Sequence, residues 1–365
     1  MKQAIIFGIT GQDGSHLADL LLSKGYHVVG VSRRASTDNT ERIKHILGND
    51  RFDLVQGDIT DVYSVQNILR QYANVDEVYN LAAQSHVAVS FKQPALTWDI
   101  TGKGCLNILQ SMVDLGVNAR FYQASSSEMF GKNFDTSQGD HSKYQDEDTK
   151  FMPQSPYAIA KCAAHHMTRL FREAYGLHAS AGILFNHEGP RRGEAFVTRK
   201  ITKWISKYYN WLQLEAKIGG EFLEDTKSDP DYILLVEPQT AQSTKQQVCA
   251  KFPKLRLGNL EAFRDWGYAG DYVEAMWMML QKDSPEDYVI CTGETHTIRE
   301  FLDVAFSHID VESWQGLVVQ DPEFYRPAEV DFLRGDNSKA RTELGWQPKN
   351  TFTDLVKMMV DNDFK

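Results

Sequence analysis

The sequence predicts an α/β fold, a Rossmann-type doubly wound parallel sheet with a smaller C-terminal α/β domain. Through the first half of the chain, short apolar runs alternate with amphipathic segments, which is the pattern of parallel strands joined by helices. A glycine-rich turn follows the first apolar run. The second half is less regular and contains a long polar stretch, which favours a separate, smaller domain.

The first half supplies alternating strands and helices. Strands are predicted at 4–7, 28–31, 53–55, 77–81, 119–123 and 179–184, and helices at 16–24, 63–72, 102–115 and 156–175. Ligands of such sheets bind at the carboxyl ends of the strands. Residues that directly follow a strand are therefore the first candidates for a site.

The second half is predicted to contain fewer elements. Helices are expected at 197–209, 268–281, 298–308 and 352–361, and a strand at 288–291. Between Trp211 and Pro253 the chain turns polar, with one aliphatic run at 233–236. We interpret residues 212–252 as an insertion in the form of a surface hairpin.

Composition excludes several classes of protein. The 365 residues carry a net charge of -10, whereas an electrostatic nucleic-acid binder needs a basic face. The four cysteines are scattered without metal-ligand spacing, so we expect no metal site and a reducing, cytoplasmic location. No signal-peptide pattern and no run of membrane-spanning length is expected.

Residues 8–14, GITGQDG, are the first motif that carries chemistry. Gly8, Gly11 and Gly14 follow a predicted strand and open a predicted helix, which is the context of a dinucleotide site. Glycine lets the backbone approach a pyrophosphate, whose charge then meets the helix N-terminus. The alternative is a glycine-rich turn without a ligand.

Two further positions bear on the choice of nucleotide. Arg33 and Arg34 stand at the end of the second strand, where an NAD enzyme usually has an acidic residue. A guanidinium there suits a 2′-phosphate and favours NADP, although paired arginines are often only a solvated turn. Asp58 could contact the adenine or simply cap the helix near Thr60 and Asp61.

The order of a serine cluster, a tyrosine and a lysine indicates a dehydrogenase-type site. Tyr157 and Lys161 lie four residues apart on a predicted helix and so share one face. A nearby ammonium lowers the pKa of a phenol, which can then accept a proton from a sugar hydroxyl while a nicotinamide takes the hydride. Small residues at the ends of segments 79–83 and 121–127 leave room for the nicotinamide and the sugar, and Glu128 follows the second segment. The serines could also be helix N-caps.

These motifs together resemble the extended short-chain dehydrogenases/reductases, and in detail the GDP-mannose 4,6-dehydratase family. The matching strings span most of the chain outside 211–253: 8–14 (GITGQDG), 80–86 (NLAAQSH), 122–128 (YQASSSE), 183–193 (ILFNHEGPRRG), 264–267 (RDWG), 271–277 (DYVEAMW) and 325–331 (YRPAEVD).

The resemblance implies conversion of GDP-D-mannose to GDP-4-dehydro-6-deoxy-D-mannose and water. Tyr157 would remove the C-4 hydroxyl proton while NADP+ takes the C-4 hydride, with Lys161 holding the phenolate and the ribose. The C-4 ketone acidifies the C-5 hydrogen, which makes Glu128 a sufficient base. Ser126, where the family often has threonine, would help Glu128 to release water from C-6, and the hydride then returns to C-6.

The resemblance also assigns binding residues. For NADP these are Gly8, Thr10, Gly11, Gln12, Asp13, Gly14, Arg33, Asp58, Ile59, Leu81, Ala82, Ala83, Gln84, Ser85, Tyr157, Lys161, His187 and Arg192. For the sugar nucleotide they are Ser85, Ser126, Glu128, Asn186, Val197, Lys200, Arg264, Arg326 and Glu329. Residues 1–185 and 259–292 would then form the NADP-binding domain, and residues 186–258 and 293–365 the sugar-nucleotide-binding domain.

Three segments extend or depart from the family pattern. Residues 34–40 resemble a loop that reaches a neighbouring subunit, so a homo-oligomer, either a dimer or a tetramer, is expected. Leu96 stands where the family usually has a tyrosine beside the cofactor. The insertion at 212–252 replaces a normally short connection, and it could be a lid, an oligomer contact or inert.

Three alternative functions remain open on the sequence. The closest is a dehydratase of another GDP-sugar, such as a GDP-heptose. An NADPH-dependent reductase of a 4-keto sugar nucleotide would have no C-5 proton for Glu128 to remove. A non-catalytic NADP-binding regulator would have no need of Ser126, Glu128, Tyr157 and Lys161 together.

Overall fold

The computed structural model describes residues 1–134, 143–215, 221–222, 229–236, 248–325 and 327–364. The chain divides into two compact units, each assembled from three separate segments. The first unit contains residues 1–191, 263–295 and 328–351, and the second contains residues 192–262, 296–327 and 352–365.

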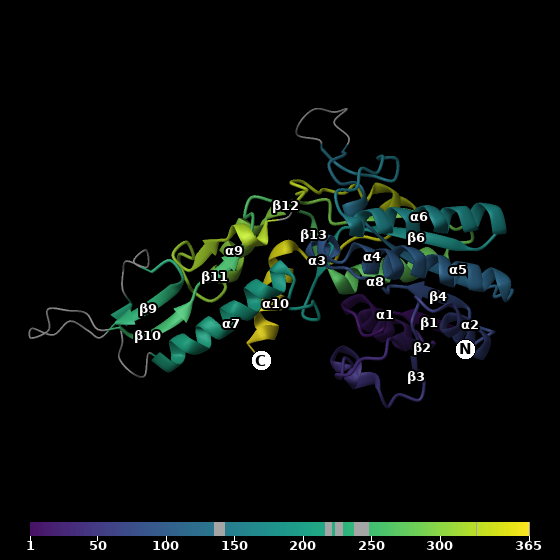
Figure 1. Ribbon diagram of the computed structural model, residues 1–365, viewed down its shortest axis with the longest axis horizontal. Helices are drawn as coiled ribbons and strands as arrows, with labels where there is room; N and C mark the ends of the chain where they lie inside the picture. Colours follow the sequence, from purple (N-terminus) through teal and green to yellow (C-terminus); the bar gives the residue numbers. More distant parts are fainter. Residues whose placement is uncertain (135–142, 216–220, 223–228, 237–247, 326, 365) are drawn as a thin grey trace, which may run out of the picture. The chain divides into compact units, whose positions relative to one another are not determined.

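A parallel sheet of seven strands forms the centre of the first unit (Figure 1). Its spatial order is β14-β6-β5-β4-β1-β2-β3, and every neighbouring pair is parallel. The strands are β1 (Gln3–Phe7), β2 (His27–Ser32), β3 (Phe52–Gln56), β4 (Glu77–Asn80), β5 (Arg120–Ser126), β6 (Ala179–Leu184) and β14 (Tyr288–Ile290). The order reverses between β1 and β4, which confirms the predicted doubly wound fold.

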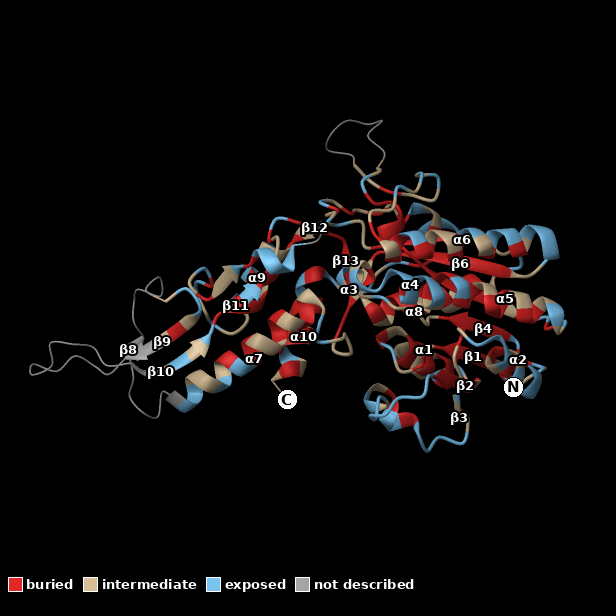
Figure 2. Cartoon of the chain, viewed as in Figure 1, coloured by how far each residue is buried: buried red, intermediate tan, exposed pale blue. Residues whose placement is uncertain are grey.

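Helices cover both faces of this sheet, because successive apolar residues of a strand point to opposite faces. On β1, Ala4 and Ile6 pack with α1 (Gln12–Ser23) and α8 (Ala269–Gln281). Ile5 and Phe7 point to the other face and pack with α2 (Val62–Gln71), α5 (Gly104–Asp114) and α6 (Pro156–Tyr175). The residues of β1 are therefore buried on both faces of the sheet, whereas the edge strand β3 has exposed residues (Figure 2).

Residues 328–351 belong to the first unit and not to the second domain, where we expected them. Val330 and Leu333 pack in one core cluster with Phe130 and Phe185. Farther along, Trp346 is buried and donates from its indole nitrogen to the carbonyl of Asp271 at 2.9 Å. This segment also contains the π-helix η6 (Ala340–Leu344).

Several elements differ from the prediction. The helix α1 begins at Gln12 and not at His16, because Gly11 is its N-cap. The region predicted as a helix from residue 102 begins as the π-helix η2 (Trp98–Lys103), which continues into α5. The short helices α3 (Val87–Lys92) and α4 (Pro94–Thr97) were not predicted. Neither were β7 (Asn186–Glu188) and β13 (Trp266–Tyr268), which pair in parallel.

The second unit combines three helices with short strands. Its elements are α7 (Val197–Glu215), α9 (Ile298–Ser307), α10 (Phe352–Asp363), β8 (Glu221–Phe222), β9 (Tyr232–Val236), β10 (Val248–Pro253), β11 (Leu255–Leu257), β15 (His296–Thr297), β16 (Val318–Gln320) and the 3-10 helix η5 (Pro322–Phe324). The helices pack against one another. Strands β9 and β10 are antiparallel, which confirms the hairpin expected within the insertion. Trp204 of α7 contacts Phe252 of β10 at a ring-centroid distance of 5.4 Å.

Candidate active site

The glycine turn between β1 and α1 is shaped by close backbone approaches. Gly8 has φ +89, and a Cβ there would lie 2.8 Å from the nitrogen of Ala82. A Cβ on Gly14 would lie 2.4 Å from the carbonyl oxygen of Gly8. Gly11 caps α1 without a side-chain hydrogen bond. The first N–H groups of α1 therefore have no side-chain cap, and this arrangement fits the pyrophosphate of a dinucleotide.

Polar contacts hold this turn against the segment that follows β6. His187 lies between two acceptors, with Nε2 2.8 Å from Oδ2 of Asp13 and Nδ1 2.7 Å from the carbonyl oxygen of Phe185. The amide of Gln12 donates to the carbonyl oxygen of His187 at 3.0 Å. The structure thus brings the neighbouring residues Gln12 and Asp13 together with His187, which is distant in sequence.

Arg42, which was not singled out in the sequence, also supports the turn. Its Nη1 donates to the carbonyl oxygen of Thr10 at 3.2 Å, and its Nε donates to the carbonyl oxygen of Arg191 at 2.6 Å. Arg42 lies on the 3-10 helix η1 (Glu41–Ile46). One guanidinium therefore fixes both the glycine turn and the end of the 186–191 segment.

The predicted ribose and adenine contacts lie at the ends of β2 and β3. Arg33 follows β2 and is exposed. Asp58 accepts hydrogen bonds from the backbone nitrogen and the hydroxyl of Thr60 at 2.9 and 2.7 Å. The N-cap of α2 is Asp61 and not Asp58. Ile59 is buried in the core beside α2 and α5.

The segment 81–85 continues from the end of β4. Leu81 donates from its backbone nitrogen to the carbonyl oxygen of Phe7 at 3.0 Å, which holds the segment beside β1. Leu81, Ala82, Ala83 and Gln84 are half-buried, whereas Ser85 is exposed. The backbone of Gln84 is held by the hydroxyl of Thr101 at 3.2 Å.

The predicted catalytic residues come from β5, its following turn, and α6. Ser126 ends β5 and caps the 3-10 helix η3 (Ser127–Met129), because its hydroxyl accepts from the nitrogen of Glu128 at 3.3 Å. Helix α6 begins at the N-cap Ser155 and packs against both β5 and η3. Tyr157, Lys161, Ser126 and Glu128 are all buried.

Lys161 is fixed at the end of β5. Its Nζ donates to the carbonyl oxygen of Ala124 at 2.6 Å and lies 5.8 Å from the centroid of the Tyr157 ring. Burial lowers the pKa of Lys161 to about 8, while the charge of Asp13 opposes this shift. Its ammonium is therefore held one helical turn beyond Tyr157, as the spacing predicts.

Three further predicted substrate residues of the first unit are Asn186, Arg264 and Glu329. Asn186 starts β7, and its Oδ1 is buried without a hydrogen-bond partner among the described residues. Arg264 is buried and donates from Nη2 to Glu329 at 3.0 Å. Arg264 and Glu329, both predicted to bind the sugar nucleotide, thus pair with each other.

Asp265, beside Arg264, is a further buried carboxylate that the sequence did not single out. It accepts from the nitrogen and hydroxyl of Thr292 and from the nitrogen of Gly293, at 2.7 to 2.9 Å. Burial raises the pKa of Asp265 to about 6, and these hydrogen bonds oppose the shift. Asp265 joins the loop after β14 to the segment that carries Arg264.

The remaining predicted residues belong to the second unit. Arg192 stacks on the ring of Phe196 at 3.7 Å. Val197 begins α7, and Lys200 on the same helix donates to the carbonyl oxygen of Arg256 at 2.7 Å and lies 3.6 Å from the centroid of the Phe324 ring. Burial lowers the pKa of Lys200. Arg326 lies outside the described residues.

Neither a metal-binding cluster nor a membrane-spanning helix occurs among the described residues. No group of three or more His, Cys, Asp or Glu side chains is arranged to hold a metal ion in the described part of the chain. Of the helices described, none has both the length and the apolar content needed to cross a membrane.

Comparison with known proteins places these features in a family context. The family model described as GDP-mannose 4,6 dehydratase matches residues 5–233 and 235–359. GDP-mannose 4,6 dehydratase 1 of Arabidopsis thaliana is 46% identical over 377 residues, which cover 100% of this chain and 90% of the relative. GDP-mannose 4,6-dehydratase of Vibrio cholerae is 41% identical over 397 residues, covering 100% of this chain and 94% of the relative.

Solved structures with the same fold are more distant in sequence. UDP-glucose 4-epimerase of Thermotoga maritima superimposes with a TM-score of 0.76 at 23% identity, covering 99% of this chain and 98% of the other. dTDP-glucose 4,6-dehydratase of Bacillus anthracis gives a TM-score of 0.75 at 18% identity, covering 99% and 96%. At these identities the likeness concerns the fold.

Proposed function

Because the chain belongs to the GDP-mannose 4,6-dehydratase family, we propose that it is a hydro-lyase that converts GDP-D-mannose to GDP-4-dehydro-6-deoxy-D-mannose and water. The observation that carries this proposal is the buried junction of α6 with β5 and η3. It places the helix of Tyr157 and Lys161 against the segment of Ser126 and Glu128. A base for oxidation and a base for elimination are thus supplied by adjoining elements.

The proposed cofactor is NADP. A nicotinamide dinucleotide supplies a hydride acceptor for C-4 and a hydride donor for C-6. The uncapped N-terminus of α1 and the glycines at 8, 11 and 14 support binding of its pyrophosphate. The exposed Arg33 at the end of β2 supports a 2′-phosphate, and so NADP over NAD. The other residues predicted to bind the cofactor complete the proposed dinucleotide site.

In the first half of the reaction, the Tyr157 phenolate takes the proton of the C-4 hydroxyl. Lys161 supports this step because a nearby ammonium stabilises a phenolate. The hydrogen bond from Lys161 to Ala124 keeps that ammonium in place. The result is a ketone at C-4, which makes the neighbouring C-5 hydrogen acidic.

In the second half, Glu128 removes the C-5 proton as a general base. The C-6 hydroxyl then leaves as water, with its proton supplied by Glu128 and a hydrogen bond from Ser126. The local contact between the Ser126 hydroxyl and the Glu128 nitrogen supports their joint action. Once the hydride taken from C-4 has been returned to C-6, C-5 regains a proton. The net reaction is therefore dehydration, with no net change in the oxidation state of the cofactor.

The remaining predicted residues are proposed to bind the GDP moiety. Asn186 offers an oxygen that has no other described partner. Arg264, already oriented by Glu329, offers charge to a phosphate or a donor to the ribose. Ser85, Val197, Lys200 and Arg326 complete the proposed set.

A homo-oligomer, either a dimer or a tetramer, is proposed as the working form, in the cytoplasm. Leu96 on α4, Trp98 on η2 and Ile159 on α6 are exposed apolar side chains on elements that pack together. Clustered apolar exposure is typical of protein–protein contacts. The loop at 34–40 is a second proposed contact.

The test is incubation of the purified protein with GDP-mannose and a trace of NADP+, followed by mass analysis. We expect the nucleotide sugar to lose one water with no net formation of NADPH. In a parallel assay with a 4-keto sugar nucleotide and added NADPH, consumption of NADPH in proportion to product would indicate a reductase instead. Unchanged GDP-mannose beside turnover of another GDP-sugar, such as a GDP-heptose, would reassign the substrate.

A further inference from the structure

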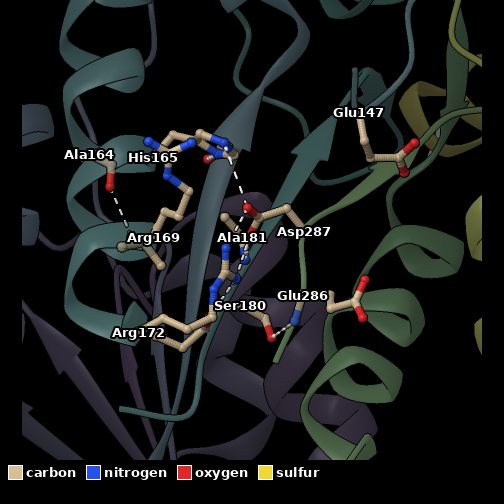
Figure 3. A network of polar contacts seen from close by, with 12 residues as sticks. Glu147, Ala164, His165, Arg169, Arg172, Ser180, Ala181, Glu286 and Asp287 are labelled. Carbon is tan, nitrogen blue, oxygen red and sulfur yellow. Dashed lines mark hydrogen bonds and ion pairs between the residues drawn. The ribbon is translucent and has the colours of Figure 1, made fainter. Parts of the chain in front are cut away.

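A polar chain, buried at Ser125 and His165 and half-buried at Arg172 and Asp287, connects the edge strand β14 to the end of β5. Asp287, just before β14, accepts two hydrogen bonds from Arg172 at 3.0 and 2.9 Å and a third from the nitrogen of Ala181 at 3.0 Å. On its other side lies the ring of His165, with Nε2 3.8 Å from the carboxylate (Figure 3). The Nδ1 of His165 is 3.1 Å from the hydroxyl of Ser125.

The charge state of this chain follows from its surroundings. Burial lowers the pKa of His165 to about 4, although Asp287 opposes the shift. Burial raises the pKa of Asp287, but Arg172 and His165 outweigh it and lower that pKa overall. A neutral imidazole therefore faces a carboxylate, which favours the hydrogen on Nε2. Nδ1 is then an acceptor, and the Ser125 hydroxyl donates to it.

Helix α6 thus holds the end of β5 at two successive residues. Lys161 binds the carbonyl oxygen of Ala124, and His165, one turn farther along the same face, binds the side chain of Ser125. The next residue is Ser126, whose hydroxyl holds the nitrogen of Glu128. The position of Glu128 relative to Tyr157 therefore depends on both attachments.

We propose that His165 is a positioning residue, which acts through Ser125 to set Ser126 and Glu128 against Tyr157 and Lys161 for the elimination step. This inference rests on the proposed function. It gives a role to Ser125, His165 and Asp287, which take no direct part in the proposed reaction. Misplacement of a reacting group by about 1 Å can cost on the order of a hundredfold in rate, so one lost hydrogen bond at this junction affects turnover more than binding.

Variants at the two partners test the proposal. His165→Phe keeps a ring of similar shape but removes the acceptor, and Ser125→Ala removes the donor. His165→Asn retains an acceptor close to the position of Nδ1. The matched control is His166→Phe, because His166 lies on the same helix and packs against Phe151 and His165, whereas the Ser125 hydroxyl bonds to the ring of His165.

We expect His165→Phe and Ser125→Ala each to lower kcat by roughly tenfold to a hundredfold, with KM for GDP-mannose within about twofold. The loss of kcat in the double variant should be no larger than in either single variant, because both substitutions remove the same hydrogen bond. Reduced nicotinamide should accumulate during turnover, since elimination slows more than oxidation. His165→Asn should recover most of the rate, and His166→Phe should match the wild type.

Several outcomes would overturn the proposal: wild-type kcat in Ser125→Ala, additive losses in the double variant, or equal loss of both half-reactions. If His165→Phe does not fold, the kcat of Ser125→Ala alone tests the proposal. An NMR measurement of the ring nitrogens needs no substrate, and a hydrogen on Nδ1 at neutral pH would also refute the proposal. An inactive wild type with the expected tautomer would instead overturn only the proposed function.

Discussion

The ammonium of Lys161 donates a 2.6 Å hydrogen bond to the carbonyl oxygen of Ala124, and so joins helix α6 to the last residues of β5. This bond satisfies a buried cation with a backbone acceptor. It also fixes the distance along the sheet between the helix of Tyr157 and the strand end that leads to Glu128.

Removing either proposed base should stop turnover while leaving the fold intact. Tyr157→Phe and Glu128→Gln are each expected to lower kcat by roughly 10²- to 10⁴-fold, because each removes a group that moves a proton in the transition state. Tyr175→Phe, at the exposed end of the same helix, is the control and should keep wild-type activity. Mass analysis of the nucleotide sugar measures the rate, and near-normal turnover in Tyr157→Phe or Glu128→Gln would refute the assigned roles.

A methyl group at Gly14 should destabilise the first unit and weaken cofactor binding. The added Cβ would lie 2.4 Å from the oxygen of Gly8 and 2.8 Å from the Cα of Ile9, so the helix must shift away from the strand. Such overpacking typically costs about 1–3 kcal/mol. Gly48→Ala is the matched control, because a Cβ there meets no atom within 4 Å. Urea unfolding and titration with NADP+ measure both effects, and equal behaviour of the two variants would contradict the close approach.

Arg33 is expected to make the protein bind NADP+ more tightly than NAD+. Loss of a charged hydrogen bond to a 2′-phosphate is expected to cost about 1.5–3 kcal/mol. Arg33→Ala should therefore bind NADP+ roughly tenfold to a hundredfold more weakly and bind NAD+ as the wild type does. Arg70→Ala, an exposed arginine on α2, serves as control in the same calorimetric titrations. A parallel loss for both dinucleotides would show that Arg33 does not read the phosphate.

Stability should fall as the pH drops from about 6.5 toward 4. Burial lowers the pKa of His16 and of His165 to about 4 in the folded chain, whereas an unfolded histidine titrates near 6.5. In that window the unfolded state binds more protons, so acid favours unfolding. The groups acting on His165 are Asp287, His166, Arg172 and Arg169. His165→Asn should show a smaller loss of unfolding free energy between pH 7 and pH 5, measured with urea; an unchanged pH slope would place the titration elsewhere.

The fold was predictable where local pattern and tertiary structure agree. The buried strands β1 and β2 and the long helix α6 were found because their apolar residues recur at the expected spacing. The pair β7 and β13 was missed because each strand has three residues, and its partner lies about 80 positions away in sequence. The segment 328–351 was misassigned because its place depends on long-range packing of Val330 and Leu333.

The proposed site was predictable to a similar degree. Motif order and the family resemblance identified Tyr157, Lys161 and Glu128. The resemblance did not identify His165, although its spacing of four residues from Lys161 is a signal that could have found it. Its partners Ser125 and Asp287 come from distant parts of the chain, and only the sheet order, in which β6 lies between β5 and β14, brings them near His165.

The alternation of the two units along the chain has a consequence for synthesis on the ribosome. The six segments pass from one unit to the other five times, and the first unit is completed only by residues 328–351. The edge strand β14 joins β6 across more than 100 residues, so the nascent chain must leave β6 unpaired on that side while the intervening segment is translated. Burial of Phe130 and Phe185 by Val330 and Leu333 comes later still, because both of these residues follow β14 in the chain.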